Sequence, residues 1–398
     1  MPDINTVFEL HRLAVREGTR YTKRRESFNE IAASKGRHFI GIAGLRGVGK
    51  SVILKQLASK TDSSLYISLD SIDPSDLFET IKELNESYGI KLFLLDEVHF
   101  CKNIAHVLKK AYDFLNVKII FTSSVAIGMH QSAYDLSRRV RIINLHPFSL
   151  REYIYFHHDR KLPPLTLEMI RNKLWTPEHL MYGSCLEHYM KGGNMPFHLE
   201  ETETLPFLSN ILQTIINKDI PGIAKVSMDE LDIINKVVEF IGKSDVDGIS
   251  YSSVSRNLGI TKFKAIKYLE LLEKAFVLRR VMPAGTNVIK EPKVVMMPPF
   301  RLLFRNYKEC VGGLREDFMV ESLSSKQMRF YYLKSTRGAK IPDYLVYEND
   351  EKIIIEVGGK GKGREQFKGI KEKKQIIFSH ASSLDGIRRP LYLAGFLA

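Results

Sequence analysis

The feature that most constrains this chain is the string GLRGVGKS at positions 44–51, which matches G-x-x-x-x-G-K-[ST] in full. An apolar run predicted to be a buried strand, RHFIGIA, precedes it, and SVILKQLASK follows with helical spacing. A glycine-rich loop between a strand and a helix N-terminus offers phosphate oxygens backbone N–H groups and the positive end of a helix dipole. The alternative, a glycine-rich turn with a chance Lys-Ser pair, is disfavoured by this flanking pattern.

The loop predicts a site for ATP and Mg²⁺. Lys50 is expected to hold the β and γ phosphates and to serve catalysis by its charge, and Ser51 is expected to ligate Mg²⁺. The residues expected to line the nucleotide are Gly44, Leu45, Arg46, Gly47, Val48, Gly49, Lys50 and Ser51.

A second motif, KLFLLDE at positions 91–97, is an apolar strand that ends in two acids. Asp96 is predicted to support Mg²⁺, directly or through water, and Glu97 is predicted to be the general base that polarises the attacking water. Many strands end in an acidic turn, but the position of this one, after the loop and one intervening predicted strand, makes the interpretation specific.

Two further sets of candidates have open alternatives. The hydroxyls of Thr122, Ser123 and Ser124 follow the predicted strand Lys118–Phe121, and they are expected either to sense the γ-phosphate or to cap the next helix. Ser123 is the residue of the three that we place at the nucleotide. Arg138 and Arg139 are expected to supply positive charge to the transition state. Their alternative is a surface ion pair.

The chain is long enough, at 398 residues, for two or three domains. Five short apolar runs, with crossover segments between them, predict an α/β core with a largely parallel sheet; they are Phe39–Ala43, Leu65–Leu69, Leu92–Leu95, Lys118–Phe121 and Val140–Leu145. The predicted division is an N-terminal helical segment (1–36), a P-loop core (37–150), a helical lid (151–229), a winged helix (230–288) and a C-terminal α/β domain (289–398).

Composition adds a few limits. The net charge of +13 and pI near 9.4 favour an acidic partner such as nucleic acid without proving one. Three scattered cysteines exclude a cysteine-rich zinc site and fit a reducing cytoplasm. The chain lacks both an apolar run of the ~20 residues that span a bilayer and a signal-peptide pattern, so we expect a cytoplasmic protein with no membrane partner.

The strings LLDEVHF, FTSS, DLSRR, PFSLREY, KGGNMP and NKDI resemble prokaryotic AAA-type P-loop ATPases that carry a C-terminal domain of unknown function. The resemblance runs from Arg37 to the end of the chain. It implies an ASCE-class sheet with an extra strand between the P-loop and Asp96 strands. It also implies nucleotide binding by Gly44–Ser51, metal support from Asp96 and a base in Glu97.

The segment from Asp229 to Gly285 has the pattern of a winged helix. Helices are predicted at Leu231–Ile241 and Ser252–Leu258, with a turn at Gly259 and a third helix from Thr261, followed by a wing strand. If DNA binds, the third helix is expected to contact it through Lys262, Lys264 and Lys267. The alternative is a rigid spacer or a protein contact.

The last block predicts a restriction-endonuclease-like fold, with Glu321 on a helix and Asp343 and Glu356 on neighbouring strands. Strands are expected at Phe330–Leu333, Tyr344–Tyr347, Lys352–Val357, Ile376–Phe378 and Leu391–Leu393. Nucleases of this kind follow the second acid with a lysine two residues later, where this chain has Gly358. The first lysine after Glu356 is Lys360, which lies on the same face of the strand but two residues beyond the position of the catalytic lysine. Only a bulge at Gly358-Gly359 would bring it close enough. We therefore expect an inactive domain with a phosphate-facing surface made of Lys360, Lys362, Arg364 and Lys368.

Two function classes remain. One is an ATP-driven machine or switch acting at nucleic acid, and the other is a nucleotide-controlled signalling or interaction protein with slow hydrolysis. A small-molecule kinase fits the Asp-Glu pair and the long C-terminal extension poorly. The sequence leaves open whether the protein is an oligomer.

Overall fold

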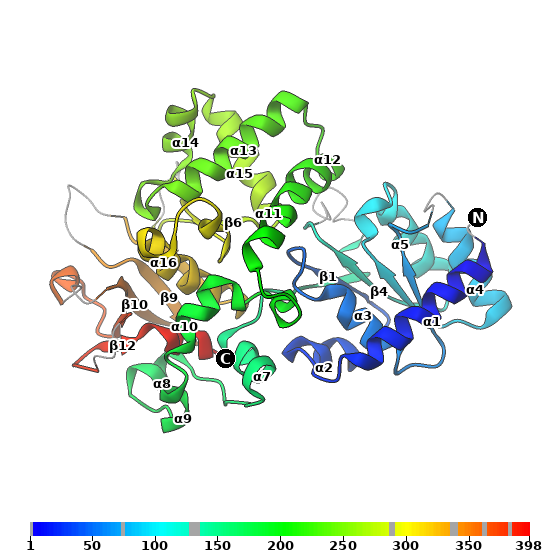
Figure 1. Ribbon diagram of the computed structural model, residues 1–398, viewed down its shortest axis with the longest axis horizontal. Helices are drawn as coiled ribbons and strands as arrows, with labels where there is room; N and C mark the ends of the chain where they lie inside the picture. Colours follow the sequence, from blue (N-terminus) through cyan, green and yellow to red (C-terminus); the bar gives the residue numbers. More distant parts are fainter. Residues whose placement is uncertain are drawn as a thin grey trace. The chain divides into compact units, whose positions relative to one another are not determined.

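The computed structural model describes residues 3–72, 76–126, 136–285, 291–334, 341–359, 364–380 and 384–398. These form two compact units, one made of residues 1–146 and 214–226 and the other of residues 147–213 and 227–398. Each unit has its own five-stranded sheet (Figure 1). The finer five-part division predicted from the sequence stays a prediction.

The sheet of the first unit is parallel throughout, in the order β2-β3-β4-β1-β5. β4 lies between β1 and β3, which confirms the extra strand that the resemblance implied. All five predicted strands are present within two residues at each end: β1 (Phe39–Ala43), β2 (Ser64–Ser68), β3 (Leu92–Asp96), β4 (Lys118–Ser123) and β5 (Val140–Asn144).

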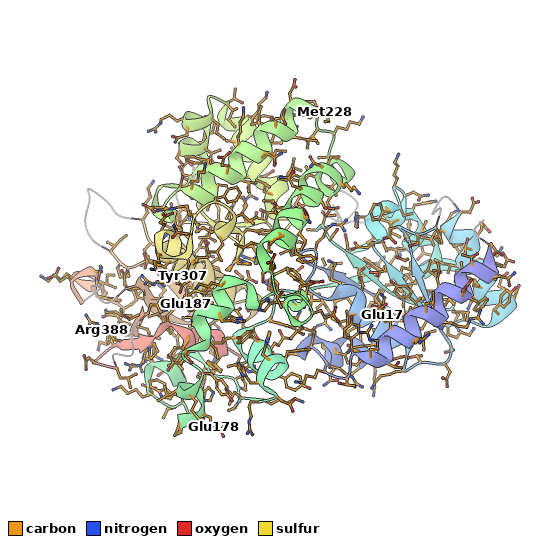
Figure 2. All side chains as sticks on the ribbon, in the orientation of Figure 1. Glu17, Glu178, Glu187, Met228, Tyr307 and Arg388 are labelled. Carbon is orange, nitrogen blue, oxygen red and sulfur yellow. The ribbon has the colours of Figure 1, made fainter. Side chains whose placement is uncertain are left out.

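The sheet shares its apolar core with helices of the first unit, whose Val7, Ile81 and Leu108 pack among the buried strand residues. The helices of this unit are α1 (Ile4–Arg20), α2 (Glu26–Ala32), α3 (Lys50–Ala58), α4 (Leu77–Tyr88), α5 (Ile104–Phe114) and α12 (Ile220–Ile223). α1 begins at Asp3, whose carboxylate caps the helix by accepting from the N–H groups of Asn5 and Thr6. It approaches α3 so closely at Gly18 that a Cβ there would lie 2.1 Å from the Lys55 carbonyl oxygen. On the same helix, Glu17 accepts from Lys55 Nζ at 2.6 Å (Figure 2 labels Glu17).

The second unit contains a helical part and a mixed part. Its first helices are α7 (Leu150–His158), α8 (Leu167–Arg171), α9 (Pro177–Met181), α10 (Cys185–His188) and α11 (Thr204–Thr214), whose last residue is assigned to the first unit. Three helices follow, α13 (Met228–Lys243), α14 (Tyr251–Leu258) and α15 (Lys262–Lys274), and then an antiparallel pair, β6 (Leu278–Val281) and β7 (Lys293–Met296). Gly259 ends α14 with φ of 63°, and Thr261 caps α15, as the sequence predicted.

The second sheet has the order β12-β11-β10-β9-β8. Its strands are β8 (Arg329–Tyr332), β9 (Tyr344–Glu348), β10 (Glu351–Gly358), β11 (Gln375–Ser379) and β12 (Arg388–Pro390). β8, β9 and β10 are antiparallel neighbours, whereas β10, β11 and β12 run parallel. α16 (Tyr307–Ser325) contributes Leu314 and Phe318 to the same core cluster as Tyr344 and Ile355 of the sheet.

One predicted element is wrong. Leu391–Leu393, expected to be a strand, lies in a 3-10 helix over Leu391–Phe396, and the last strand ends just before it at Pro390. Leu391, Leu393, Ala394 and Phe396 are all buried in the core cluster. A short segment that is buried on every side shows a continuous apolar run in either conformation, so its periodicity cannot distinguish the two.

Among the helices of the described residues, none is both long and apolar enough to cross a bilayer.

Candidate nucleotide site

The glycine-rich loop joins β1 to α3 in a conformation that depends on its glycines. Gly47 and Gly49 have φ of 81° and 88°, in the left-handed region that favours glycine. A Cβ at Gly44 would lie 2.2 Å from the Leu145 carbonyl oxygen. The loop therefore forms a tight backbone cradle at the N-terminus of α3, which suits a phosphate group.

Lys50 reaches back over this cradle. Its Nζ donates to the carbonyl oxygens of Gly44 and Leu45, both at 2.9 Å. The side chain is buried, and burial lowers the pKa of the amine although the carboxylates of Glu97 and Asp96 oppose that shift. Ser51, the next residue, lies half-buried in the first turn of α3.

Asp96 ends β3 and is held by two hydroxyls. It accepts from Tyr66 Oη at 2.6 Å and from Thr122 Oγ1 in a short hydrogen bond. The Thr122 oxygen accepts in turn from the Glu97 backbone N–H at 3.0 Å. Thr122 on β4 therefore fixes both acids of the pair, one through its side chain and the other through its backbone.

Glu97 follows directly, with φ of 54° and ψ of 48°. This left-handed conformation is uncommon for a residue with a side chain, and such residues gather at functional sites. One carboxylate oxygen lies 3.2 Å from His99 Nδ1 and the other 4.0 Å from Arg46 Nη1. Burial acts to raise the pKa of Glu97, but His99, Lys50 and Arg46 together lower it to about 2. Glu97 is therefore a carboxylate at neutral pH.

The donor set fits Mg²⁺. Ser51 and Asp96 offer a hydroxyl and a carboxylate, which are hard oxygen ligands, beside a loop in which Gly47 and Gly49 have positive φ. Two protein ligands are typical where phosphates and waters complete the shell of Mg²⁺. The described residues contain no group of three histidine, cysteine or acidic side chains placed to hold a metal ion by themselves.

Ser123 lies beside the loop, where its carbonyl oxygen accepts from the Gly44 N–H at 3.2 Å. Its hydroxyl donates to the Val125 carbonyl oxygen at 2.8 Å in a local turn, whereas the hydroxyl of Thr122 reaches Asp96 and that of Ser124 reaches Asp219. The helix that Ser123 was alternatively expected to cap falls largely on residues outside the described ranges.

Arg138 and Arg139 lie at the amino ends of the strands, opposite the end of the sheet that carries the loop. Arg139 precedes β5, its carbonyl accepts from the Phe39 N–H at the start of β1, and its guanidinium pairs with Asp113 at 2.9 Å. The loop follows the other end of β1, so these arginines do not reach the loop of their own chain. The observed ion pair is the alternative that the sequence left open for Arg139, while Arg138 is exposed.

Arg46, in the loop itself, lies at the site. The sequence predicted that Arg46 lines the nucleotide, but it did not predict which residue pairs with it. Its guanidinium makes a two-pronged pair with Asp219, at 2.7 Å for both contacts. The sequence assigned no role to His99, and it predicted Thr122 only as one of three hydroxyls near the γ-phosphate and not as a partner of the two acids. His99 and Asp219 stand in LLDEVHF and NKDI, two strings that marked the family resemblance, and this was the signal that pointed to them.

Comparison with known proteins agrees with this geometry. Residues 36–154 match the family model described as an AAA domain. This segment carries an AAA-type P-loop ATPase fold. Residues 185–300 match a second family model, that of a domain of unknown function (DUF8612). This segment follows the AAA domain in the chain, and the match indicates no activity for it.

The chain is also similar to other proteins over most of its length. Uncharacterized protein MJ1637 of Methanocaldococcus jannaschii is 28% identical over 94% of this chain and 87% of its own length. Among solved structures, the Aeropyrum pernix Orc1 protein in complex with DNA is 12% identical, with coverage of 79% of this chain and 93% of that one and a TM-score of 0.30. A RuvB variant from Thermotoga maritima is 14% identical, with coverage of 70% and 90% and a TM-score of 0.26.

Proposed function

We propose that this protein binds ATP with Mg²⁺ and hydrolyses it in the AAA domain. One observation carries the proposal. The loop after β1, the acid pair after β3 and the hydroxyls of β4 meet at the carboxyl edge of one parallel sheet, with Thr122 bonded to both acids. Ligands of open α/β sheets bind at this edge.

In the proposed reaction, the loop N–H groups and Lys50 bind the β and γ phosphates. Ser51 and Asp96 would hold Mg²⁺, which when bound neutralises charge on the phosphate oxygens. Glu97 orients the attacking water and takes its proton. Because the pKa of Glu97 is about 2, its carboxylate is a weak base until the Lys50 amine, one of the cations that lower this pKa, binds the phosphates instead.

We further propose that the second unit contains the winged helix and the restriction-endonuclease-like domain and that the ATPase acts at nucleic acid. The sequence of α13, α14, α15 and the β6–β7 pair supports the first assignment. A helix followed by three antiparallel strands and then a parallel strand, α16 to β11, supports the second. The net charge of +13 supports a nucleic-acid partner.

A specific observation favours the alternative, a nucleotide-controlled protein that binds protein partners. Lys262 pairs with Glu291, and Lys267 pairs with Glu230 at 2.8 Å, so carboxylates of the same chain already neutralise two of the three lysines expected to face DNA. Beside them, Phe263 is 78% exposed. An exposed aromatic side chain suits a protein interface as well as base stacking.

One experiment addresses both proposals. ATP binding and ATPase rate are measured for the full chain, alone and with single-stranded or duplex DNA at several salt concentrations. We expect Mg²⁺-dependent turnover that DNA stimulates and that salt weakens, because phosphate contacts release counterions. Absence of ATP binding would reject the ATPase proposal. Turnover that DNA leaves unchanged at low salt would favour the protein-binding alternative.

A further inference from the structure

Asp219 stands at the centre of the nucleotide site although it lies 173 residues after Arg46 in the chain. Besides its two contacts with Arg46, its carboxylate lies 3.3 Å from Ser124 Oγ and 3.7 Å from His99 Nε2. The residue is 1% exposed. A single buried carboxylate thus contacts the loop, the tip of β4 and the turn after β3.

The segment that carries Asp219 has an unusual place in the chain. Asp219 ends a π-helical turn (Ile215–Asp219) between α11 and α12. Residues 214–226 belong to the first unit, but the residues on both sides of them, up to Gln213 and from Ser227, belong to the second. Asp219 is therefore a contact between the nucleotide site and a segment that continues into the second unit at both ends.

Asp219 also controls the charge around the predicted base. The Arg46 guanidinium is shared between Asp219 at 2.7 Å and Glu97 at 4.0 Å. His99 likewise lies between the two carboxylates, with Nδ1 toward Glu97 and Nε2 toward Asp219. A guanidinium held by two hydrogen bonds to one carboxylate has little freedom to move to another. Without Asp219, Arg46 would keep Glu97 as its neighbouring carboxylate and pair with it more closely.

We propose that Asp219 is a positioning residue for ATP hydrolysis: it holds Arg46 away from Glu97 and so keeps the Glu97 carboxylate available to the attacking water. The inference rests on the proposed ATPase function. It assigns Asp219 no contact with the nucleotide, so its loss should reduce turnover and spare ATP affinity, which depends on the loop and Lys50.

The test is a double-mutant cycle between Asp219→Asn and Arg46→Gln in the full chain, with kcat, KM and directly measured ATP affinity as readouts. We expect Asp219→Asn to lower kcat by about tenfold or more, the scale on which misplaced catalytic groups act, while ATP affinity changes less than about twofold. In the Arg46→Gln background, Asp219→Asn should cause no further loss, because the cation it positions is absent. Glu17→Gln, which removes an ion pair between α1 and α3 in the same unit, is the control and should match the parent chain.

The outcomes separate two failures. A parent chain that neither binds nor hydrolyses ATP rejects the proposed function itself. An active parent with an equally active Asp219→Asn variant rejects the inference. Equal losses of kcat and affinity that recur in the Arg46→Gln background would show a structural role only. Asp219→Asn alone could unfold the protein, because it leaves the half-buried Arg46 charge without its carboxylate. The double variant lacks that charge, so the comparison of its kcat and ATP affinity with those of Arg46→Gln alone still tests the inference.

Discussion

At the scale of single residues, Lys50 is expected to govern nucleotide affinity. Lys50→Ala removes the cation matched to the phosphates, and a hydrogen bond to a charged group contributes about 1.5–3 kcal/mol. ATP affinity should fall by about 10- to 100-fold, measured by titration calorimetry. Lys55→Ala, on the same helix but paired with Glu17, is the matched control. Equal ATP affinity in the two variants would show that Lys50 does not contribute to ATP binding.

Glu97→Gln is expected to separate binding from turnover. An amide cannot take a proton from water, so ATP affinity should persist while the single-turnover rate falls by at least about 100-fold. Hydrolysis at the parent rate would show that Glu97 is not the base.

The lowered pKa of Glu97 also has a consequence for stability. A carboxyl group with a pKa of about 2 in the folded state and an ordinary pKa of 4.5 contributes stability above pH 4.5, and this contribution is lost as the pH falls toward 2. The contribution is on the order of 3 kcal/mol. The stability difference between the parent chain and Glu97→Gln, measured by urea unfolding, should therefore shrink between pH 5 and pH 2. A difference that stays constant over this range would mean that the neighbouring cations do not stabilise the charge.

Local patterns in the sequence predicted the loop and the acid pair, because each lies within a few residues of a recognisable strand or helix. They did not predict the pair of Arg46 with Asp219, since a contact across 173 residues leaves no mark on spacing. They also indicated two arginines that do not reach the loop of their own chain. Arg138 and Arg139 are adjacent in sequence to β5, but they precede it, and the amino ends of parallel strands lie away from the loop.

At the scale of elements, α15 allows a graded test of DNA binding. Its three lysines differ in the structure: Lys262 and Lys267 are paired with acids, whereas Lys264 is exposed and no ion pair is described for it. Lys264→Ala should weaken duplex binding and lower the salt slope by about one unit. Lys262→Ala and Lys267→Ala should have smaller effects, with Lys243→Ala on α13 as the surface control. If all three variants bind duplex DNA with the affinity of the parent chain, the result would favour the protein-binding alternative for these helices.

The second sheet is expected to lack nuclease activity. Asp343 accepts from the Val357 N–H at 2.7 Å and lies 4.0 Å from Lys293 Nζ, and the Glu356 side chain is fully buried. Lys360 and Lys362 lie outside the described residues, the side chain of Arg364 is not described, and Lys368 is exposed. With Mg²⁺ or Mn²⁺, the protein should leave DNA and RNA intact. Cleavage by the parent chain that disappears in Asp343→Ala would contradict this assignment.

Most elements followed from period and composition, because strands buried on both faces and amphipathic helices have distinct patterns. The failure at Leu391–Leu393 shows the limit of that reasoning. The pairing of the strands, such as the position of β4 between β1 and β3, followed from the family resemblance and not from the pattern of any single strand.

At the scale of the whole molecule, the chain passes from the first unit to the second twice, at residues 146–147 and 226–227, and returns between them at 213–214. The returning segment, residues 214–226, is attached to the nucleotide site through Asp219. Loss of the Arg46–Asp219 pair therefore acts on this segment. A guanidinium held by two hydrogen bonds to one carboxylate exchanges partners with difficulty, so we expect the pair to persist when a nucleotide is bound.

We therefore expect amide hydrogen exchange in residues 214–226 to depend on the Arg46–Asp219 pair and not on which nucleotide is bound. In the parent chain, exchange in this segment should be equally slow with a non-hydrolysable ATP analogue and with ADP, because the pair that anchors the segment persists in both states. Arg46→Gln should speed exchange with either nucleotide, because it removes the cation that Asp219 holds. Peptides from α16, whose buried residues pack in the core of the second unit, provide the internal reference. Faster exchange with the ATP analogue than with ADP in the parent chain would show that the γ-phosphate draws Arg46 from Asp219, and this would contradict the positioning role of Asp219.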